Sequence, residues 1–492
     1  MAYALDVKRL GLGIAAMLIT AALMWFGTGM HPFWPLMWFA PLPVLLFAAD
    51  ASWWGALITA GLACVIGNLN LWDYFHSVLG APLSIVLRIY ITLGLMFALG
   101  VLLYRALLQR KAYWSALLAF PVFWTSFEYL LNLTSPHGTA GSLAYSQLAF
   151  LPFLQLASLT GPWGMSFLVL LFSTALALGI HLYRSDRHQA LNIFGVSAGV
   201  IAAVLVFGLV RLMLPAPGQP VKVGLVASDA RDNGNVADEG APTAELFKAY
   251  APSVAALASQ GADVVVLPEK LGVAVEPDTK AVDAELQSLA ELTHVRIVAG
   301  LIRVVPPSAT NIVKIKYNEA RVYTPGAPVL SYDKQHMLPP YESNLTPGSS
   351  LTLMDAAGGA GTWGVEICKD MDFTQPSRQY GQAGAGLMLV PAWDFVGDYI
   401  EHGHIAIMRG VEGGFTVVRS AKRGSIYVSD DRGRILAEVK SDAAPFATLL
   451  ASVPAVHDNT LFQLLGDWFA WVALAILAFT LVQLVRLWKQ HR

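Results

Sequence analysis

Long uninterrupted apolar runs limit the fold of this chain more than any other feature of its sequence. A helix needs about 20 apolar residues to cross the ~30 Å hydrocarbon core of a bilayer. Charged residues make up only 13% of the chain, whereas soluble domains carry about 25%. About eight runs reach or approach the spanning length: 10–26, 33–49, 53–72, 83–104, 115–133, 163–183, 192–214 and 463–487. The sequence therefore predicts a polytopic α-helical membrane domain.

Lys and Arg residues in the short loops predict how these spans are oriented, because cytoplasmic loops are enriched in them. They cluster at 8–9, 105–111, 184–187 and 486–492. Three other loops contain neither residue: 27–32, 73–82 and 134–162. With eight spans, all the basic clusters fall on one side of the membrane. We therefore expect a multi-pass protein of the inner (plasma) membrane, with both termini cytoplasmic and the segment before the last span periplasmic.

The polar segment before the last span has the pattern of a separate α/β domain. From Val221 onward, short runs rich in β-branched residues alternate with helical patterns at 242–261 and 282–295, and later follow one another directly. This order predicts a layered α/β domain with two packed sheets. The expected organisation is a transmembrane domain with seven spans at 1–214, the α/β domain at 215–460 and a C-terminal transmembrane helix at 461–492.

Several classes of function find no support in the sequence. The formal net charge of −2, with no long basic run, argues against a nucleic-acid partner. The two cysteines, Cys64 and Cys368, are too few for a disulfide framework or a cysteine zinc site. No GxGxxG follows a strand pattern, and neither HExxH nor a phosphate-binding glycine loop occurs. We therefore expect neither a metal nor a cofactor.

Three reactive side chains stand at the ends of predicted strands. Glu269 ends ADVVVLPE, Lys334 lies in SYDKQHMLPPYE and Cys368 ends TWGVEIC. A carboxylate can take the proton of a cysteine thiol, and a lysine cation can stabilise the thiolate and an oxyanion. Together they would make an acyl-transfer site. The spacing alone leaves this open, because a cysteine at a strand end is more often part of a core and a loop lysine is more often solvated.

The motifs around these residues resemble those of the nitrilase (carbon-nitrogen hydrolase) superfamily. VVLPEK, YDKQHMLPPYE and GVEICKDMDF are similar to its Glu, Lys and Cys motifs in the same chain order, and Glu342 lies eight residues after Lys334 as in that family. FAPLPVLLFAA (39–49) and the stretch 141–169 resemble the membrane part of apolipoprotein N-acyltransferases, the membrane branch of the superfamily. The resemblance implies that the α/β domain is an extramembrane nitrilase-like α-β-β-α sandwich.

The resemblance also implies an activity. Cys368 would take a fatty acyl chain from a phospholipid as a thioester and pass it to the α-amine of the lipid-modified N-terminal cysteine of a diacylated apolipoprotein. Glu269 would act as base and acid, and Lys334 would stabilise the oxyanion and be oriented by Glu342. The expected partners are thus a phospholipid donor, the apolipoprotein acceptor and membrane lipid. The alternatives are a membrane-anchored nitrilase-type amidase or C–N hydrolase, an acyltransferase with another acceptor, and a silent membrane scaffold.

Some positions depart from the family pattern. Lys369 and Asp370 follow Cys368 where the family usually has an aromatic residue and Glu. We expect Asp370 to replace the acid and Lys369 to lower the pKa of the thiol further. VPAWDF (390–395) is closer to soluble nitrilases, and 422–424 replaces an Asn-Thr-Gly-like stretch. These departures would suit a divergent paralogue with another donor or acceptor.

Four further residues are candidates for the substrate pocket. Trp393 and Phe373 would line an acyl pocket, and Tyr341 lies in MLPPY, which would form a lid. The alternative is that the two aromatics belong to the core and that MLPPY is only a stiff loop. Glu128, in the predicted span 115–133, lies where the family has an EWLR-like stretch, although here it is EYLL. It is either functional or a hydrogen-bonded structural carboxyl.

Overall fold

The computed structural model describes residues 2–214, 220–229, 243–277, 279–308, 312–356, 361–397 and 401–490. The chain forms two compact units. The membrane unit comprises Met1–Leu133, Gly141–Met213 and Leu465–Arg492, and the α/β unit comprises Thr134–Ala140 and Leu214–Leu464. The short segment Thr134–Ala140, placed in the transmembrane domain by the sequence, therefore belongs with the α/β unit.

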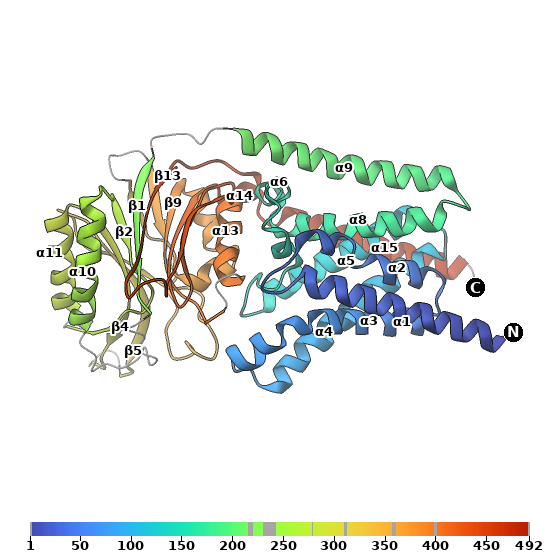
Figure 1. Cartoon of the computed structure of the whole chain (residues 1–492), viewed down its shortest axis with the longest axis horizontal. Helices are drawn as coiled ribbons and strands as arrows, with labels where there is room; N and C mark the ends of the chain where they lie inside the picture. Colours follow the sequence, from blue (N-terminus) through green and yellow to red (C-terminus); the bar gives the residue numbers. More distant parts are fainter. Residues whose placement is uncertain are drawn as a thin grey trace. The chain divides into compact units, whose positions relative to one another are not determined.

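The membrane unit is a bundle of long apolar helices (Figure 1). Among the described residues, seven helices are long and apolar enough to cross a membrane. They are α1 (Ala2–Gly27), α3 (Trp53–Asn68), α4 (Leu83–Leu108), α5 (Tyr113–Thr134), α8 (Pro162–Leu182), α9 (Arg187–Met213) and α15 (Trp468–Gln490). The expectation of a multi-pass helical domain is confirmed.

The predicted span 33–49 is wrong as a continuous helix. The chain instead forms a 3-10 helix, η1 (Trp34–Trp38), followed by the nine-residue α2 (Leu42–Asp50). Prolines lack a backbone N–H donor and clash with the preceding helical turn, and Pro35, Pro41 and Pro43 fall within this segment. The orientation argument counted eight crossings, so the sidedness of the chain stays a prediction.

The α/β unit contains two β-sheets. Within the described residues, the first sheet has seven strands in the order β13-β1-β2-β4-β5-β6, with β3 paired to β4, and the second has six in the order β12-β11-β10-β9-β8-β7. The first comprises β1 (Val221–Ala227), β2 (Val264–Val266), β3 (Val273–Val275), β4 (Arg296–Val305), β5 (Ile315–Tyr323), β6 (Leu330–Asp333) and β13 (Ala447–Val453). The second comprises β7 (Leu353–Asp355), β8 (Thr362–Val365), β9 (Ala385–Trp393), β10 (Thr416–Lys422), β11 (Ser425–Ser429) and β12 (Ile435–Lys440).

Side-chain alternation along the strands builds the layers. On β1, Val223 and Leu225 face the core between the sheets, where they join Leu387 of β9, while Val226 joins the cluster under the outer helices. That outer layer is α10 (Thr243–Ser259) and α11 (Thr279–Thr293). On the other side, α13 (Glu401–Gly413) packs against the second sheet (Figure 1), and so does the short α12 (Ser377–Gln382). The predicted α-β-β-α sandwich is confirmed.

Candidate active site

The three predicted reactive residues follow strands of both sheets. Glu269 comes shortly after β2, and its backbone N–H donates to the carbonyl of Ala392 in β9 at 3.2 Å. Lys334 directly follows β6, and its N–H donates to the carbonyl of Asn318 in β5 at 2.8 Å. Cys368 begins the 3-10 turn η6 (Cys368–Asp372) after β8. Residues from the two sheets thus meet at one place between them.

Glu269, Lys334 and Glu342 form a buried charge network. Lys334 Nζ lies 2.9 Å from Glu269 Oε1 and 2.9 Å from Glu342 Oε2. Asn318 Nδ2 donates to Glu269 Oε1 at 2.6 Å and to Glu342 Oε1 at 2.9 Å. A second ammonium, that of Lys270, pairs with Glu342 and lies 3.8 Å from Glu269 Oε1. Two carboxylates therefore share two cations and an amide donor.

The electrostatics keep Lys334 and Glu342 charged. Burial disfavours the ammonium of Lys334, but Glu269 and Glu342 outweigh it and hold its pKa well above the usual value. Burial also disfavours the carboxylate of Glu342, but Lys334 and Lys270 hold its pKa well below the usual range. Glu342 is therefore a fixed counter-ion for Lys334 and not a proton carrier at neutral pH.

Cys368 is held in a strained backbone conformation with a protonated thiol. Its φ of 43° lies in the left-handed region, which is uncommon for a residue with a side chain and is often found at functional sites. Burial raises the pKa of the thiol, and Glu269 raises it further, while Lys334 and Arg419 act in the opposite direction. Lys369, which the sequence suggested as a further cation acting on the thiol, is not among the groups that shift its pKa. A neighbouring base must remove the proton.

Lys369 contacts other groups than the sulfur. Its Nζ lies 3.2 Å from Nδ1 of His137 and 3.4 Å from Oδ2 of Asp372, and only 2% of the side chain is exposed. His137 comes from Thr134–Ala140, the segment that joins the α/β unit. In the same segment, Thr139 donates to the carbonyl of Asp372 from its backbone N–H at 2.9 Å and from its hydroxyl at 2.7 Å. Lys369 thus fastens this segment to the turn that carries the cysteine.

Asp370 links the loop after Lys334 to the turn after Cys368. It accepts hydrogen bonds from the backbone N–H groups of Gln335 at 3.0 Å and His336 at 2.7 Å, and from the hydroxyl of Tyr332 at 2.8 Å. Its side chain is fully buried. These contacts give Asp370 a positioning role at the turn that carries the cysteine.

The predicted pocket aromatics lie in different surroundings. Lys422 Nζ lies 3.5 Å and Lys270 Nζ 5.4 Å from the centroid of the Trp393 ring. The backbone carbonyl of Trp393 accepts a hydrogen bond from Cys368 Sγ at 3.6 Å. Phe373 stacks on His336 with ring centroids 3.7 Å apart. Tyr341 is 51% exposed. Trp393 therefore adjoins the cysteine directly, while Tyr341 is a surface side chain.

Glu128 lies in α5 of the membrane unit, where its carboxylate is fully hydrogen-bonded. It accepts from Trp124 Nε1 at 3.0 Å, from the Ser142 hydroxyl at 3.1 Å and from the Leu143 N–H at 2.7 Å. These contacts favour the structural interpretation, because Glu128 ties α5 to the segment that follows Gly141.

Comparison with known proteins identifies the family. Residues 20–175 match the family described as the apolipoprotein N-acyltransferase N-terminal domain, and residues 241–452 match the carbon-nitrogen hydrolase family. The chain belongs to the apolipoprotein N-acyltransferase family. Two similar relatives with that name come from Geobacter metallireducens and Vibrio vulnificus. The first is 26% identical over 73% of this chain and 73% of its own length, and the second is 22% identical over 88% and 94%.

A solved structure of an amidase from Nesterenkonia sp. is 20% identical to this family member, covers 51% of the chain and 95% of the amidase, and has a TM-score of 0.41.

In the described residues of this N-acyltransferase family member, no group of three or more His, Cys, Asp and Glu side chains could hold a metal ion.

Four residues beside the predicted set were missed by sequence reasoning: Lys270, Asn318, Asp394 and Arg419. Lys270 directly follows Glu269 in the VVLPEK motif, so the motif itself contained a signal. Arg419 lies in the middle of the apolar strand TVVRSAK, and a charge in such a run is a signal, because arginine is almost never fully buried without a partner. In the structure it is 1% exposed. Asn318 gave no signal, because its role depends on the register between β5 and β6.

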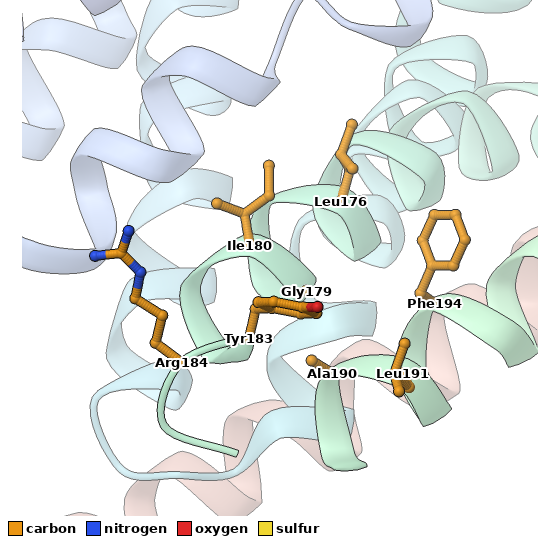
Figure 2. A pocket seen from close by; sticks show the side chains of 8 residues that line it. All are labelled: Leu176, Gly179, Ile180, Tyr183, Arg184, Ala190, Leu191 and Phe194. Carbon is orange, nitrogen blue, oxygen red and sulfur yellow. The ribbon is translucent and has the colours of Figure 1, made fainter. Parts of the chain in front are cut away.

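A cavity in the membrane unit of this N-acyltransferase family member lies between α8 and α9 (Figure 2). Its volume is about 390 Å³, and Leu176, Ile180 and Phe194 provide much of its apolar wall, with Tyr183 and Arg184 near the connecting turn. None of the predicted site residues lines it.

Proposed function

We propose that this protein transfers a fatty acyl chain from a phospholipid, through a thioester on Cys368, to the α-amine of the lipid-modified N-terminal cysteine of apolipoproteins. The observation that carries the proposal is the buried network of Glu269, Lys334 and Glu342 next to a protonated cysteine, in a multi-pass membrane chain of this family. Both substrates are lipid-anchored, so the reacting site has to be tethered at a membrane.

Glu269 is the general base in the first half-reaction. Because the pKa of the Cys368 thiol is raised, the proton has to move when the sulfur attacks, and the Glu269 carboxylate receives it. The S–C bond forms at the ester carbonyl carbon, and the C–O bond of the ester breaks. The proton then passes from Glu269 to the departing alkoxide, which releases a lysophospholipid.

Lys334 stabilises the oxyanion of each tetrahedral intermediate. Its ammonium stays charged through Glu269 and Glu342, so it presents a fixed positive charge to the developing oxygen anion. The backbone N–H of Lys369, which directly follows the nucleophile, is the second donor. Glu342 keeps the ammonium in place when Glu269 becomes neutral.

In the second half-reaction, the acceptor amine attacks the thioester carbon. The N–C bond forms and the C–S bond breaks, Glu269 takes the amine proton, and the thiol is restored from it. We place the α/β unit in the periplasm at the inner membrane with both termini cytoplasmic. This placement puts all Lys and Arg clusters on one side when the segment of η1 and α2 crosses the membrane in addition to the seven long helices. Tagging of single cysteines placed in 243–277 checks this, and cytoplasmic labelling would overturn the placement.

Intact-mass spectrometry of the purified full chain with a defined phospholipid tests the proposed reaction. We expect the mass of one fatty acyl group on Cys368, its loss on addition of a diacylated lipopeptide, and its appearance on the peptide amine. C368S should form no hydroxylamine-labile adduct, and E269Q should form the adduct at least about 100-fold more slowly. Absence of an adduct on the wild-type chain would refute the proposal.

A specific observation favours a second candidate reaction. The segment VPAWDF (390–395), in which Trp393 adjoins the sulfur, is closer to soluble nitrilases. The same experiment separates the two. A Cys368 adduct that water discharges, with no product on the lipopeptide amine, would assign a membrane-anchored amidase or C–N hydrolase.

A further inference from the structure

A buried arginine stands beside the sulfur of Cys368. Arg419 lies on β10, and its Nη2 is 4.0 Å from Cys368 Sγ, within hydrogen-bonding range for sulfur. The guanidinium is 1% exposed. The Glu269–Lys334–Glu342 network comes mainly from the first sheet, whereas Arg419 reaches the same sulfur from the second. The nucleophile thus has a cation contributed by each sheet.

Asp394 fixes the direction of this guanidinium. Its Oδ1 accepts from Arg419 Nη2 at 2.6 Å and its Oδ2 accepts from Nη1 at 2.9 Å, so the planar fork is held by two bonds. Asp394 directly follows Trp393, the last residue of β9, whose carbonyl contacts Cys368 Sγ. The end of β9 therefore holds both the thiol and its arginine.

The arginine is not explained by structural pairing alone. Its Nε has no hydrogen-bond partner among the described residues, although the side chain is buried. Leaving a buried donor unmade costs about 1–3 kcal/mol. What distinguishes Arg419 from the equally buried Arg409 is the contact of its Nη2 with Cys368 Sγ. Arginine is also the cation that keeps its charge under burial, since it is not deprotonated in proteins.

We propose that Arg419 is a further catalytic residue, whose guanidinium, oriented by Asp394, stabilises the thiolate of Cys368 each time that thiolate forms. The inference rests on the proposed function for its place in the reaction. The thiolate is the nucleophile in the first half-reaction and the leaving group in the second. In both, Glu269 carries the proton, and Arg419 carries none.

The electrostatics agree with this assignment. Burial and Glu269 raise the pKa of the Cys368 thiol, while Lys334 and Arg419 lower it. Loss of the Arg419 charge therefore raises the pKa of the thiol further. The thiolate fraction at a given pH below that pKa then falls about tenfold for each unit of the rise.

The pH dependence of Cys368 alkylation by iodoacetamide tests the proposal on the full chain in detergent. We expect R419Q to be alkylated at least about tenfold more slowly than wild type at one pH below the midpoint, and R419K to lie between them. Arg409 is an equally buried arginine, paired with Glu412 at 3.0 Å, so R409K is the matched control and should retain the wild-type profile. Superposition of the R419Q and wild-type profiles would overturn the proposal.

Two further readouts keep the proposal falsifiable. If R419Q does not fold, the alkylation profiles of R419K and R409K are compared instead. Only R419K should shift the pH profile of Cys368 alkylation, and equal profiles for the two variants would contradict the role of Arg419. With a phospholipid donor, R419K should lower kcat for thioester formation with little change in KM. Alkylation requires no donor or acceptor, so a failure of acyl transfer in the wild-type chain would refute the proposed function and leave the arginine result standing.

Discussion

Lys369 Nζ lies 3.2 Å from Nδ1 of His137, across 232 positions of the sequence. The contact requires an unprotonated Nδ1, because the lysine ammonium can only donate. It joins the residue directly after the nucleophile to a short segment between two membrane-unit stretches of the chain. The position of Cys368 is therefore set partly by residues outside the main α/β sequence.

Removing the imidazole of His137 should loosen the turn that carries Cys368. H137A leaves the buried Lys369 with Asp372 and without its imidazole acceptor, at a cost of about 1–3 kcal/mol. We expect a lower free energy of unfolding of the α/β unit and slower acylation of Cys368. Chemical denaturation and single-turnover mass spectrometry measure the two effects. H188A, which removes an exposed imidazole in the membrane unit, should change neither. Equal behaviour of the two variants would contradict this account.

Gly138 should tolerate no side chain. Its φ is 54°, and an added Cβ would lie 2.5 Å from the carbonyl oxygen of Asp372. G138A therefore combines a left-handed backbone with a clash against the nucleophile's turn, and we expect it to cost more than about 2 kcal/mol. Gly326 has a φ of 71° with nothing within 4 Å of the added Cβ. G326A should cost only about 1–2 kcal/mol, because it has the left-handed backbone without the clash. The difference between the two variants therefore measures the clash at Gly138. Thermal unfolding compares them, and a G138A no worse than G326A would rule out the close approach.

Glu342 should make stability depend on acid pH. Lys334 and Lys270 hold its folded-state pKa below the ordinary value of 4.5, so its contribution is present above that value and is lost as the pH falls below it. E342Q has no such group. The difference between wild type and E342Q in free energy of unfolding should therefore be large at about pH 7 and shrink below about pH 4.5. Denaturant titrations at several pH values check the sign, and a difference that grows on acidification would disprove it.

Asn318 should matter for rate more than for binding. Its amide donates to both Glu269 and Glu342, and N318A removes both bonds while adding no charge. We expect kcat for thioester formation to fall by about 10- to 100-fold with KM nearly unchanged, since the base loses its orientation. N192A, which removes an exposed asparagine bonded to His188 in α9, is the control. A change confined to KM would place Asn318 at the substrate instead.

The sandwich and its reactive residues could be predicted because both depend on local sequence. The long strands β1, β4 and β9 are buried at nearly every position and therefore read as continuous apolar runs, and the Glu, Lys and Cys motifs directly follow or end strands. The strands β3, β6 and β7 are only three or four residues long, too short for a period to be visible. The span 33–49 was predicted from hydropathy, which does not register the missing N–H groups of its prolines.

The partners of the reactive residues could not be predicted in the same way. Asn318 reaches Glu269 through the pairing of β2 with β4 and of β4 with β5, and it reaches Glu342 through the pairing of β5 with β6. Arg419 reaches Cys368 through the alignment of β10 beside β9. Register between distant strands sets these contacts, and a single sequence does not state it. The pKa of the thiol depends on burial by both sheets, which is why the adjacent Lys369 was misleading.

The segment Thr134–Ala140 has a consequence for how the protein is made. The stretch Gly141–Met213, including α8 and α9, separates it from the rest of the α/β unit, so it is synthesised long before the turn to which it binds. The contacts between this segment and the cysteine turn therefore cannot form until both stretches of the chain have emerged on the same side of the membrane. An α/β fragment starting at Leu214 would lack His137 and Thr139, and the cysteine turn would be left without two of its anchors. Correct insertion of the helices is thus a condition for finishing the reacting site.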